Sequence, residues 1–144
     1  MPTKPCPYCH EQIDVGNFAV HCQGHEHLRP DGQQEEYVTL APELRSGQSL
    51  NSEPRVYYHE KCGAATQMPE EIVRSYLVNP YLYLADSTFC TGCGNHVPNR
   101  ECVWSETGED LQTYIDRLRT DKPEYRPGLL ARVLVLLIHQ KWIR

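Results

Sequence analysis

The chain has 144 residues, of which 40% are hydrophobic, and its formal net charge at pH 7 is −5. A chain of this length is expected to form a single domain that buries roughly 68–70% of the surface exposed in the unfolded state. The acidic balance argues against general affinity for nucleic acid, because nucleic-acid-binding domains usually carry a basic patch or stripe. No apolar run reaches the roughly 20 residues that cross a bilayer, so we expect no transmembrane segment.

Seven cysteines raise the question of whether the chain is held together by disulfide bonds or by metal. The number is odd, six of the cysteines lie in closely spaced pairs, and the residues before Cys6 lack the apolar run of a secretory signal peptide. Disulfides are rare in the cytosol, where closely spaced cysteines more often bind metal. We therefore expect a cytoplasmic, metal-binding protein.

The first predicted element is a knuckle, by which we mean a tight turn that presents a metal ligand at each end; it runs from Cys6 to Cys9. Residues 18–22 then alternate in the period-two pattern of a strand. Pro, Asp and Gly at 30–32 predict a turn, and residues 37–40 are expected to form the returning strand of a hairpin.

The middle of the chain is expected to contain a loop, a short strand and a helix. Residues 41–55 are rich in Pro, Gly, Ser, Asn and Gln and predict a surface loop. The β-favouring run 56–58 leads into the next pair of metal ligands. Pro69 suits the first position of a helix, whose apolar residues share one face and which ends at Asn79-Pro80.

The last third of the chain is predicted to be largely helical. After a knuckle at 90–93, residues 111–118 show a helical apolar stripe that Ser105 or Thr107 can cap, and Asp121-Lys122-Pro123 ends that helix. Residues 129–143 form the most apolar stretch and predict a C-terminal helix that covers the core. A partner-binding or membrane-surface role for this last helix remains the alternative.

The predicted fold class is α+β: a small zinc-binding domain of knuckles and short β-hairpins with about three helices, the last two of them C-terminal. Residues 1–104 are expected to form the zinc-binding region, and residues 105–144 a C-terminal helical segment packed on it.

Eight potential metal ligands form four pairs, each with a two-residue spacer that lets both side chains reach one metal from a tight turn. In chain order the pairs are Cys6 and Cys9, Cys22 and His25, His59 and Cys62, and Cys90 and Cys93. Eight Cys and His ligands complete two tetrahedral shells, so we predict two structural Zn²⁺ ions. In an interleaved arrangement, the first pair shares an ion with the third and the second pair shares an ion with the fourth. Closing the long intervening loop costs roughly 3 kcal/mol, which a structural zinc, contributing about 10–16 kcal/mol, can offset.

The second pair decides between alternatives. Cys22 also fits a buried strand cysteine and His25 a surface histidine, in which case His96 and Cys102 could close a local site with the knuckle at 90–93. Otherwise Cys102 fits a buried core thiol. His21 and His27 are spare candidate ligands.

The ligand order Cys-x2-Cys, Cys-x2-His, His-x2-Cys, Cys-x2-Cys resembles that of cross-brace zinc fingers, namely plant homeodomain, RING and LIM-like modules. Tyr58-His59-x2-Cys62 before a helix also resembles the aromatic-His-x2-Cys of treble-clef fingers. The resemblance covers residues 6–93 and implies a treble-clef-like fold. Thr88 and Thr91 stand where plant homeodomain and RING fingers carry Trp and Pro, so neither histone reading nor ubiquitin transfer is expected.

No catalytic residues are predicted. Pro5-Cys6-x2-Cys9 resembles half of the zinc deaminase signature, but no upstream His-x-Glu accompanies it. We expect a noncatalytic structural zinc-finger protein that serves as a protein-interaction module, with no evident small-molecule substrate. Its surface would come from the C-terminal helix and from exposed tyrosines, which fit core packing equally: Tyr57, Tyr58, Tyr81 and Tyr83. The alternatives are a small zinc-dependent enzyme or redox-sensing protein with an incomplete second metal site and, third, a nucleic-acid-binding protein.

Overall fold

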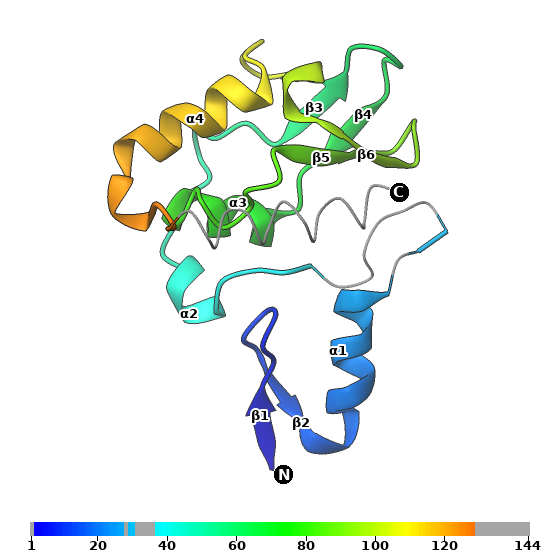
Figure 1. Ribbon diagram of the computed structural model, residues 1–144, viewed down its shortest axis with the longest axis vertical. Helices are drawn as coiled ribbons and strands as arrows, with labels where there is room; N and C mark the ends of the chain where they lie inside the picture. Colours follow the sequence, from blue (N-terminus) through cyan, green and yellow to red (C-terminus); the bar gives the residue numbers. More distant parts are fainter. Residues whose placement is uncertain (1, 28, 31–36, 129–144) are drawn as a thin grey trace.

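The computed structural model describes residues 2–27, 29–30 and 37–128, in which four helices accompany small antiparallel sheets in an α+β arrangement (Figure 1). The seven strands are β1 (Thr3–Pro5), β2 (Gln12–Asp14), β3 (Val56–His59), β4 (Ala65–Gln67), β5 (Ser87–Cys90), β6 (Asn95–Pro98) and β7 (Cys102–Trp104). The helices are α1 (Phe18–Glu26), α2 (Pro42–Arg45), α3 (Glu70–Val78) and α4 (Leu111–Asp121). The predicted C-terminal helix at 129–143 lies outside the described residues.

The first unit, which we call the finger, consists of β1, β2 and α1 and lies at one end of the molecule (Figure 1). Strands β1 and β2 pair antiparallel, with Lys4 opposite Ile13. The strand predicted for residues 18–22 is wrong, because these residues begin helix α1. The alternation was misleading since the helix is anchored on one face by Gly24 and His25, both buried, rather than by a stripe of large apolar residues.

The second unit, which we call the core unit, holds the remaining strands with α3 and α4. Strand β3 lies between β4 and β7 in one sheet, and β5 pairs with β6 in a separate hairpin. Trp104 is 1% exposed, and its ring meets those of Tyr57 and Tyr114 edge to face at centroid distances of 5.7 and 5.4 Å. The sheet and both helices therefore share one aromatic-rich core, to which Val73, Tyr76, Leu111 and Ile115 also contribute.

Helices α3 and α4 confirm the two central helical predictions. Helix α3 follows Pro69 and ends before Asn79, as the sequence indicates. Helix α4 ends at Asp121, but its N-cap is Asp110 rather than Ser105 or Thr107. The Asp110 carboxylate accepts a hydrogen bond of 2.9 Å from the Thr113 N–H, which satisfies one of the unpaired donors of the first turn.

The segment that joins the two units differs from its prediction in two places. Residues 37–40 form no strand, and the predicted surface loop 41–55 contains helix α2 and the buried Ala41. The Thr39 N–H donates to the Tyr8 carbonyl at 3.3 Å, and the Leu40 N–H donates to Ser75 Oγ at 3.1 Å. The backbone of this segment thus bonds to the finger on one side and to α3 on the other instead of pairing as a hairpin.

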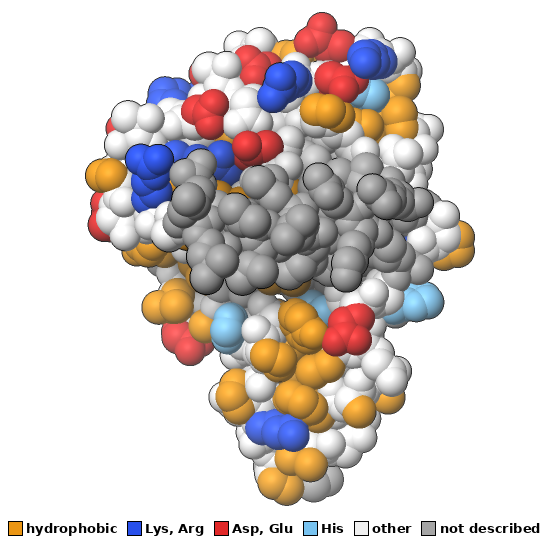
Figure 2. All heavy atoms as spheres, viewed as in Figure 1, with side chains coloured by type: hydrophobic (Ala, Val, Ile, Leu, Met, Phe, Trp, Pro, Cys, Tyr) orange, Lys and Arg blue, Asp and Glu red, His pale blue; other side chains and the backbone are white. Residues whose placement is uncertain are grey.

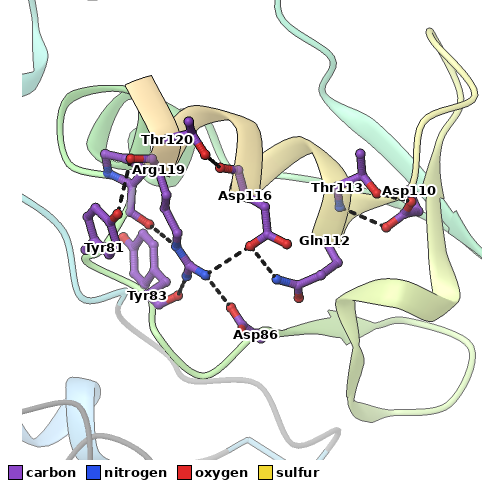
Figure 3. Close-up of polar contacts among 10 residues, drawn as sticks. Tyr81, Tyr83, Asp86, Asp110, Gln112, Thr113, Asp116, Arg119 and Thr120 are labelled. Carbon is purple, nitrogen blue, oxygen red and sulfur yellow. Dashed lines mark hydrogen bonds and ion pairs between the residues drawn. The ribbon is translucent and has the colours of Figure 1, made fainter. Parts of the chain in front are cut away.

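Arg119 of α4 fixes the chain that follows α3 (Figure 3). Its guanidinium donates to the carbonyls of Pro80 and Tyr83 at 3.0 and 2.9 Å and pairs with Asp86 at 2.9 Å. The Tyr81 hydroxyl donates in return to the Arg119 carbonyl. These bonds hold the turn that leads into β5, and so they help to place the knuckle at its end. None of the helices in the described part of the chain has the length and apolar character needed to cross a membrane.

Candidate metal centres

Two groups of Cys and His side chains gather their ligand atoms within the described residues, and in each group all four atoms lie within 4.8 Å of one another. The first group consists of Cys6, Cys9, His21 and His25, and the second of His59, Cys62, Cys90 and Cys93. Each group could hold a metal ion, and both donor sets are compatible with zinc.

The first group joins the β1–β2 knuckle to one face of α1. The sequence places His21 and His25 four residues apart, so a helix presents both rings on the same side. Their Nε2 atoms are 3.3 Å apart, and the His21 Nε2 lies 3.3 Å from Cys9 Sγ. In a tetrahedral site with metal–ligand distances of about 2.0–2.3 Å, neighbouring ligand atoms are roughly 3.3–3.8 Å apart. The separations therefore fit a shared ion.

Other contacts hold the knuckle and the helix of the finger together. The Tyr8 ring stacks on the His25 ring with centroids 4.9 Å apart, and the Tyr8 hydroxyl donates to Glu26 at 2.6 Å. The Lys4 ammonium lies 4.1 Å from the centroid of the Phe18 ring. These contacts join β1 and the knuckle to α1 independently of a metal ion.

The second group joins two knuckles, one between β3 and β4 and the other between β5 and β6. Cys90 Sγ lies 3.4 Å from Cys62 Sγ and 3.7 Å from His59 Nδ1, and Cys93 Sγ lies 3.4 Å from the same nitrogen. These separations also fit a tetrahedral site. The His59 Nε2 faces away from the sulfurs and lies 3.2 Å from a carboxylate oxygen of Glu101.

All three knuckles share one backbone geometry. The residue after the second ligand has a positive φ, at 63° for His10, 75° for Gly63 and 68° for Gly94. Its N–H donates to the carbonyl of the first ligand at 2.8, 2.7 and 2.9 Å, respectively. Glycine adopts this left-handed conformation without steric cost, whereas His10 is the exception among the three.

Backbone N–H groups of the knuckles also lower the pKa of two of the thiols. Burial raises the pKa of Cys6 and of Cys90, but N–H groups of each knuckle donate to the sulfur and bring the net pKa below its ordinary value. Burial and the neighbouring thiol raise the pKa of Cys9 and of Cys93 to about 11. Each Cys-x2-Cys pair therefore contains one sulfur stabilised as a thiolate and one whose proton a bound metal would displace.

The interleaved arrangement is not the one found, because His59 and Cys62 meet Cys90 and Cys93 instead of the first knuckle. A side-chain bond helps to explain this: the Tyr57 hydroxyl of β3 donates to the Phe89 carbonyl of β5 at 2.5 Å and ties the two hairpins together. Cys6 and Cys9 meet His21 and His25 within the finger instead.

His21, predicted from the sequence only as a spare candidate ligand, is a member of the first group. It joins Cys6, Cys9 and His25 there. Cys22, which the sequence assigned with His25 to a site with Cys90 and Cys93, belongs to neither group and is half-buried beside Cys6. Burial and its contact with Cys6 raise the pKa of Cys22, so this thiol is a poorer anion than Cys6. The signal that could have identified His21 is its four-residue spacing from His25, which puts both rings on one face of a helix and close enough to share an ion. In a strand the two residues would lie about 13 Å apart, too far to share one.

His96 and Cys102, the alternative ligands predicted for the knuckle at 90–93, belong to neither group. Cys102 is fully buried in the core, as expected for a core thiol, and burial raises its pKa to about 12. His96 packs edge to face on Phe89. The locally closed site expected as an alternative is therefore not the arrangement found in the described residues.

Gly92 lets the two knuckles of the second group approach each other. A Cβ atom at this position would lie 2.5 Å from the Ala64 Cβ and 3.0 Å from Cys62 Sγ. Gly92→Ala is expected to destabilise the metal-loaded protein by about 1–3 kcal/mol through overpacking, measured by chemical unfolding. Gly47→Ala is the matched control, because its Cβ would meet nothing within 4 Å. Equal unfolding free energies for the two variants would contradict the steric argument.

A shallow cavity of about 410 Å³ lies outside both groups, next to Tyr81, Asp116 and Arg119. Asp86 and Asp116 already pair with the Arg119 guanidinium there (Figure 3). We assign this cavity no chemical role.

Comparison of the chain with protein-family models, with curated proteins and with solved structures finds no match.

Proposed function

We propose that the protein is a noncatalytic zinc-finger protein in which two structural zinc ions support a protein-binding surface. The observation that carries the proposal is that each metal group supplies four Cys or His donors. Structural zinc sites are closed by four such ligands, whereas catalytic zinc sites keep one position for water or substrate. A small zinc enzyme or redox sensor with an incomplete second site is the weaker alternative, since both groups have a full set of donors.

The finger has the strand–strand–helix order and nearly the ligand spacing of classical Cys2His2 fingers. Its ligands follow Cys-x2-Cys-x11-His-x3-His, one residue shorter in the central interval than the usual motif. The second group draws its ligands from two hairpin knuckles and none from a helix. We therefore propose a Cys2His2-like finger followed by a pair of facing knuckles, in place of a treble clef or a cross-brace.

The surface of α1 favours protein over nucleic acid as the partner. Classical fingers contact bases through helix positions −1, 3 and 6. If the helix is counted from the 3-10 turn at Val15, these positions are Asp14, Asn17 and Val20; if it is counted from Phe18, they are Asn17, Val20 and Gln23. Neither set contains Lys or Arg, and no Lys or Arg occurs at residues 5–27.

Apolar side chains gather on the finger instead. Figure 2 shows them over the end of the molecule that holds β1, β2 and α1. Val20 is 73% exposed and Val15 is 48% exposed. Of the tyrosines expected to form a surface, Tyr57 is buried in the core and Tyr58 is exposed. The exposed valines of the finger are therefore better candidates for contact with a partner protein.

A charge on α1 tests this proposal. Val20→Asp is expected to abolish retention of proteins that the wild-type 144-residue chain captures from an extract, while the variant keeps two zinc ions by elemental analysis. Leu44→Asp is the matched control on α2, because Leu44 is also apolar and 60% exposed. Identical sets of captured proteins for wild type and Val20→Asp, or salt-dependent retention of wild type on DNA, would contradict the proposal.

A further inference from the structure

We propose that Glu101 is a positioning residue for the second metal: its carboxylate accepts the His59 Nε2–H and thereby directs the lone pair of Nδ1 toward the three cysteine sulfurs. The inference rests on the proposed function, since it presupposes a metal bound by the second group. It assigns a role to a residue that is not itself a ligand.

The orientation of the His59 ring is the first step of the argument. The ring is buried, with the residue 3% exposed. One of its nitrogens faces cysteine sulfurs and the other faces a carboxylate. Nδ1 lies 3.4 Å from Cys93 Sγ and 3.7 Å from Cys90 Sγ, whereas Nε2 lies 3.2 Å from Glu101 Oε1. A neutral imidazole has one N–H and one lone pair, so a carboxylate at Nε2 selects the tautomer whose lone pair is on Nδ1.

The backbone brings Glu101 to this place. His59 of β3 pairs with Cys102 of β7, and the Glu60 N–H donates to the Glu101 carbonyl at 3.0 Å. Glu101 ends the 3-10 turn Asn99–Glu101 directly before β7, so strand register sets its side chain beside the ring. Glu101 is thus held by the turn and by Cys102, the first residue of β7, which pairs with His59 in the sheet.

Lys61 holds the other side of the carboxylate. Its ammonium lies 2.9 Å from the same Glu101 Oε1, and the Lys61 side chain is 74% exposed while that of Glu101 is 21% exposed. The ammonium lies on the solvent side and the imidazole on the buried side. Glu101 therefore connects the ring to a cation within the same knuckle.

The two metal groups differ in the histidine nitrogen that they present. In the finger both rings turn Nε2 toward the other ligand atoms. In the second group the ligand atom is Nδ1, which is closer to the backbone, and Nε2 is left to the carboxylate. Carboxylates that accept the second N–H of a metal-bound histidine raise its basicity, and their removal typically lowers metal affinity 10–100-fold.

The test uses the 144-residue chain loaded with Cd²⁺ or Zn²⁺. Glu101→Ala is expected to lower the metal affinity of the second group about 10–100-fold, measured by chelator competition with the ¹¹³Cd signals of the two groups followed separately. The finger signal is expected to keep its affinity. In ¹⁵N spectra of the zinc-loaded wild type, His59 is expected to show a metal-bound Nδ1 and a protonated Nε2, and the Nε2–H signal should shift or broaden in Glu101→Ala.

Two further variants test whether an effect of Glu101→Ala comes from the lost contact with His59 or from a general change in fold or charge. Glu101→Gln keeps the shape and an acceptor oxygen, so it should retain the Nδ1-bound tautomer and lose less affinity than Glu101→Ala. Glu60→Gln removes a neighbouring exposed carboxylate and should change neither property. Unchanged affinity and an unchanged His59 signal in Glu101→Ala, or an equal loss in Glu60→Gln, would overturn the inference. A wild-type chain that binds fewer than two metal ions would instead overturn the proposed function.

Discussion

Cys90→Ser is expected to release the second metal ion and to abolish the cooperative unfolding of the core unit. Cys90 is fully buried, ends β5 and belongs both to the second metal group and to the hydrophobic core. Serine lacks the thiolate that zinc prefers. Structural zinc contributes about 10–16 kcal/mol, as much as the whole net stability of a typical domain, about 5–15 kcal/mol. The loss of this ion is therefore sufficient to unfold the unit.

The measurement combines elemental analysis with NMR signals from the core, such as that of the Trp104 indole. Wild type should hold two zinc ions and Cys90→Ser one. Cys102→Ser is the matched control, because Cys102 is equally buried in the same core but belongs to neither metal group. It should keep both ions and lose only about 1–3 kcal/mol for the buried hydroxyl. Retention of both ions by Cys90→Ser would contradict the assignment.

His21→Ala is expected to remove the metal of the finger and to unfold α1, while Cys22→Ala leaves both unchanged. The two residues are neighbours in the chain, but the His21 ring lies 3.3 Å from ligand atoms of both Cys9 and His25. Because the spectrum of Co²⁺ depends on its sulfur and nitrogen ligands, Co²⁺ titration can follow the finger directly. Trp104 signals should stay native in both variants, since the core unit has its own metal group.

The opposite result is equally informative. If Cys22→Ala loses one metal ion and His21→Ala keeps two, Cys22 is the ligand, as the pair spacing first indicated. If both variants lose the ion, the finger depends on the His21 and Cys22 side chains together.

The sequence predicted tight turns at 6–9, 59–62 and 90–93, and the structure forms all three, because a two-residue spacer is a local property of the chain. The fourth pair, Cys22 and His25, lies in helix α1 instead. It did not predict which knuckles meet, because that depends on contacts between segments far apart. The Tyr57 hydroxyl bond to the Phe89 carbonyl is such a contact, and nothing in the spacing of the ligands indicates it.

Local patterns also explain which elements were predicted. Helix α3 carries acidic residues in its first turn and an apolar face, so its type and its end were predicted correctly, and it begins at Glu70, directly after the predicted first residue Pro69. Helix α1 has no comparable apolar face, and the chance alternation of residues 18–22 favoured a strand. Its buried residues are Gly24 and His25, and its two candidate metal ligands, His21 and His25, are not counted in a search for hydrophobic periodicity.

The two metal groups imply an order of folding. The finger closes over residues 6–25, whereas the second group needs residues 59–93 and the helix between them to be in place. Contacts between nearby residues form faster than contacts between distant ones, because less chain entropy is lost on closing a short loop. If both groups bind metal as proposed, the finger is therefore expected to take up metal first when metal is supplied to the unfolded chain, and the core unit to fold around the second ion.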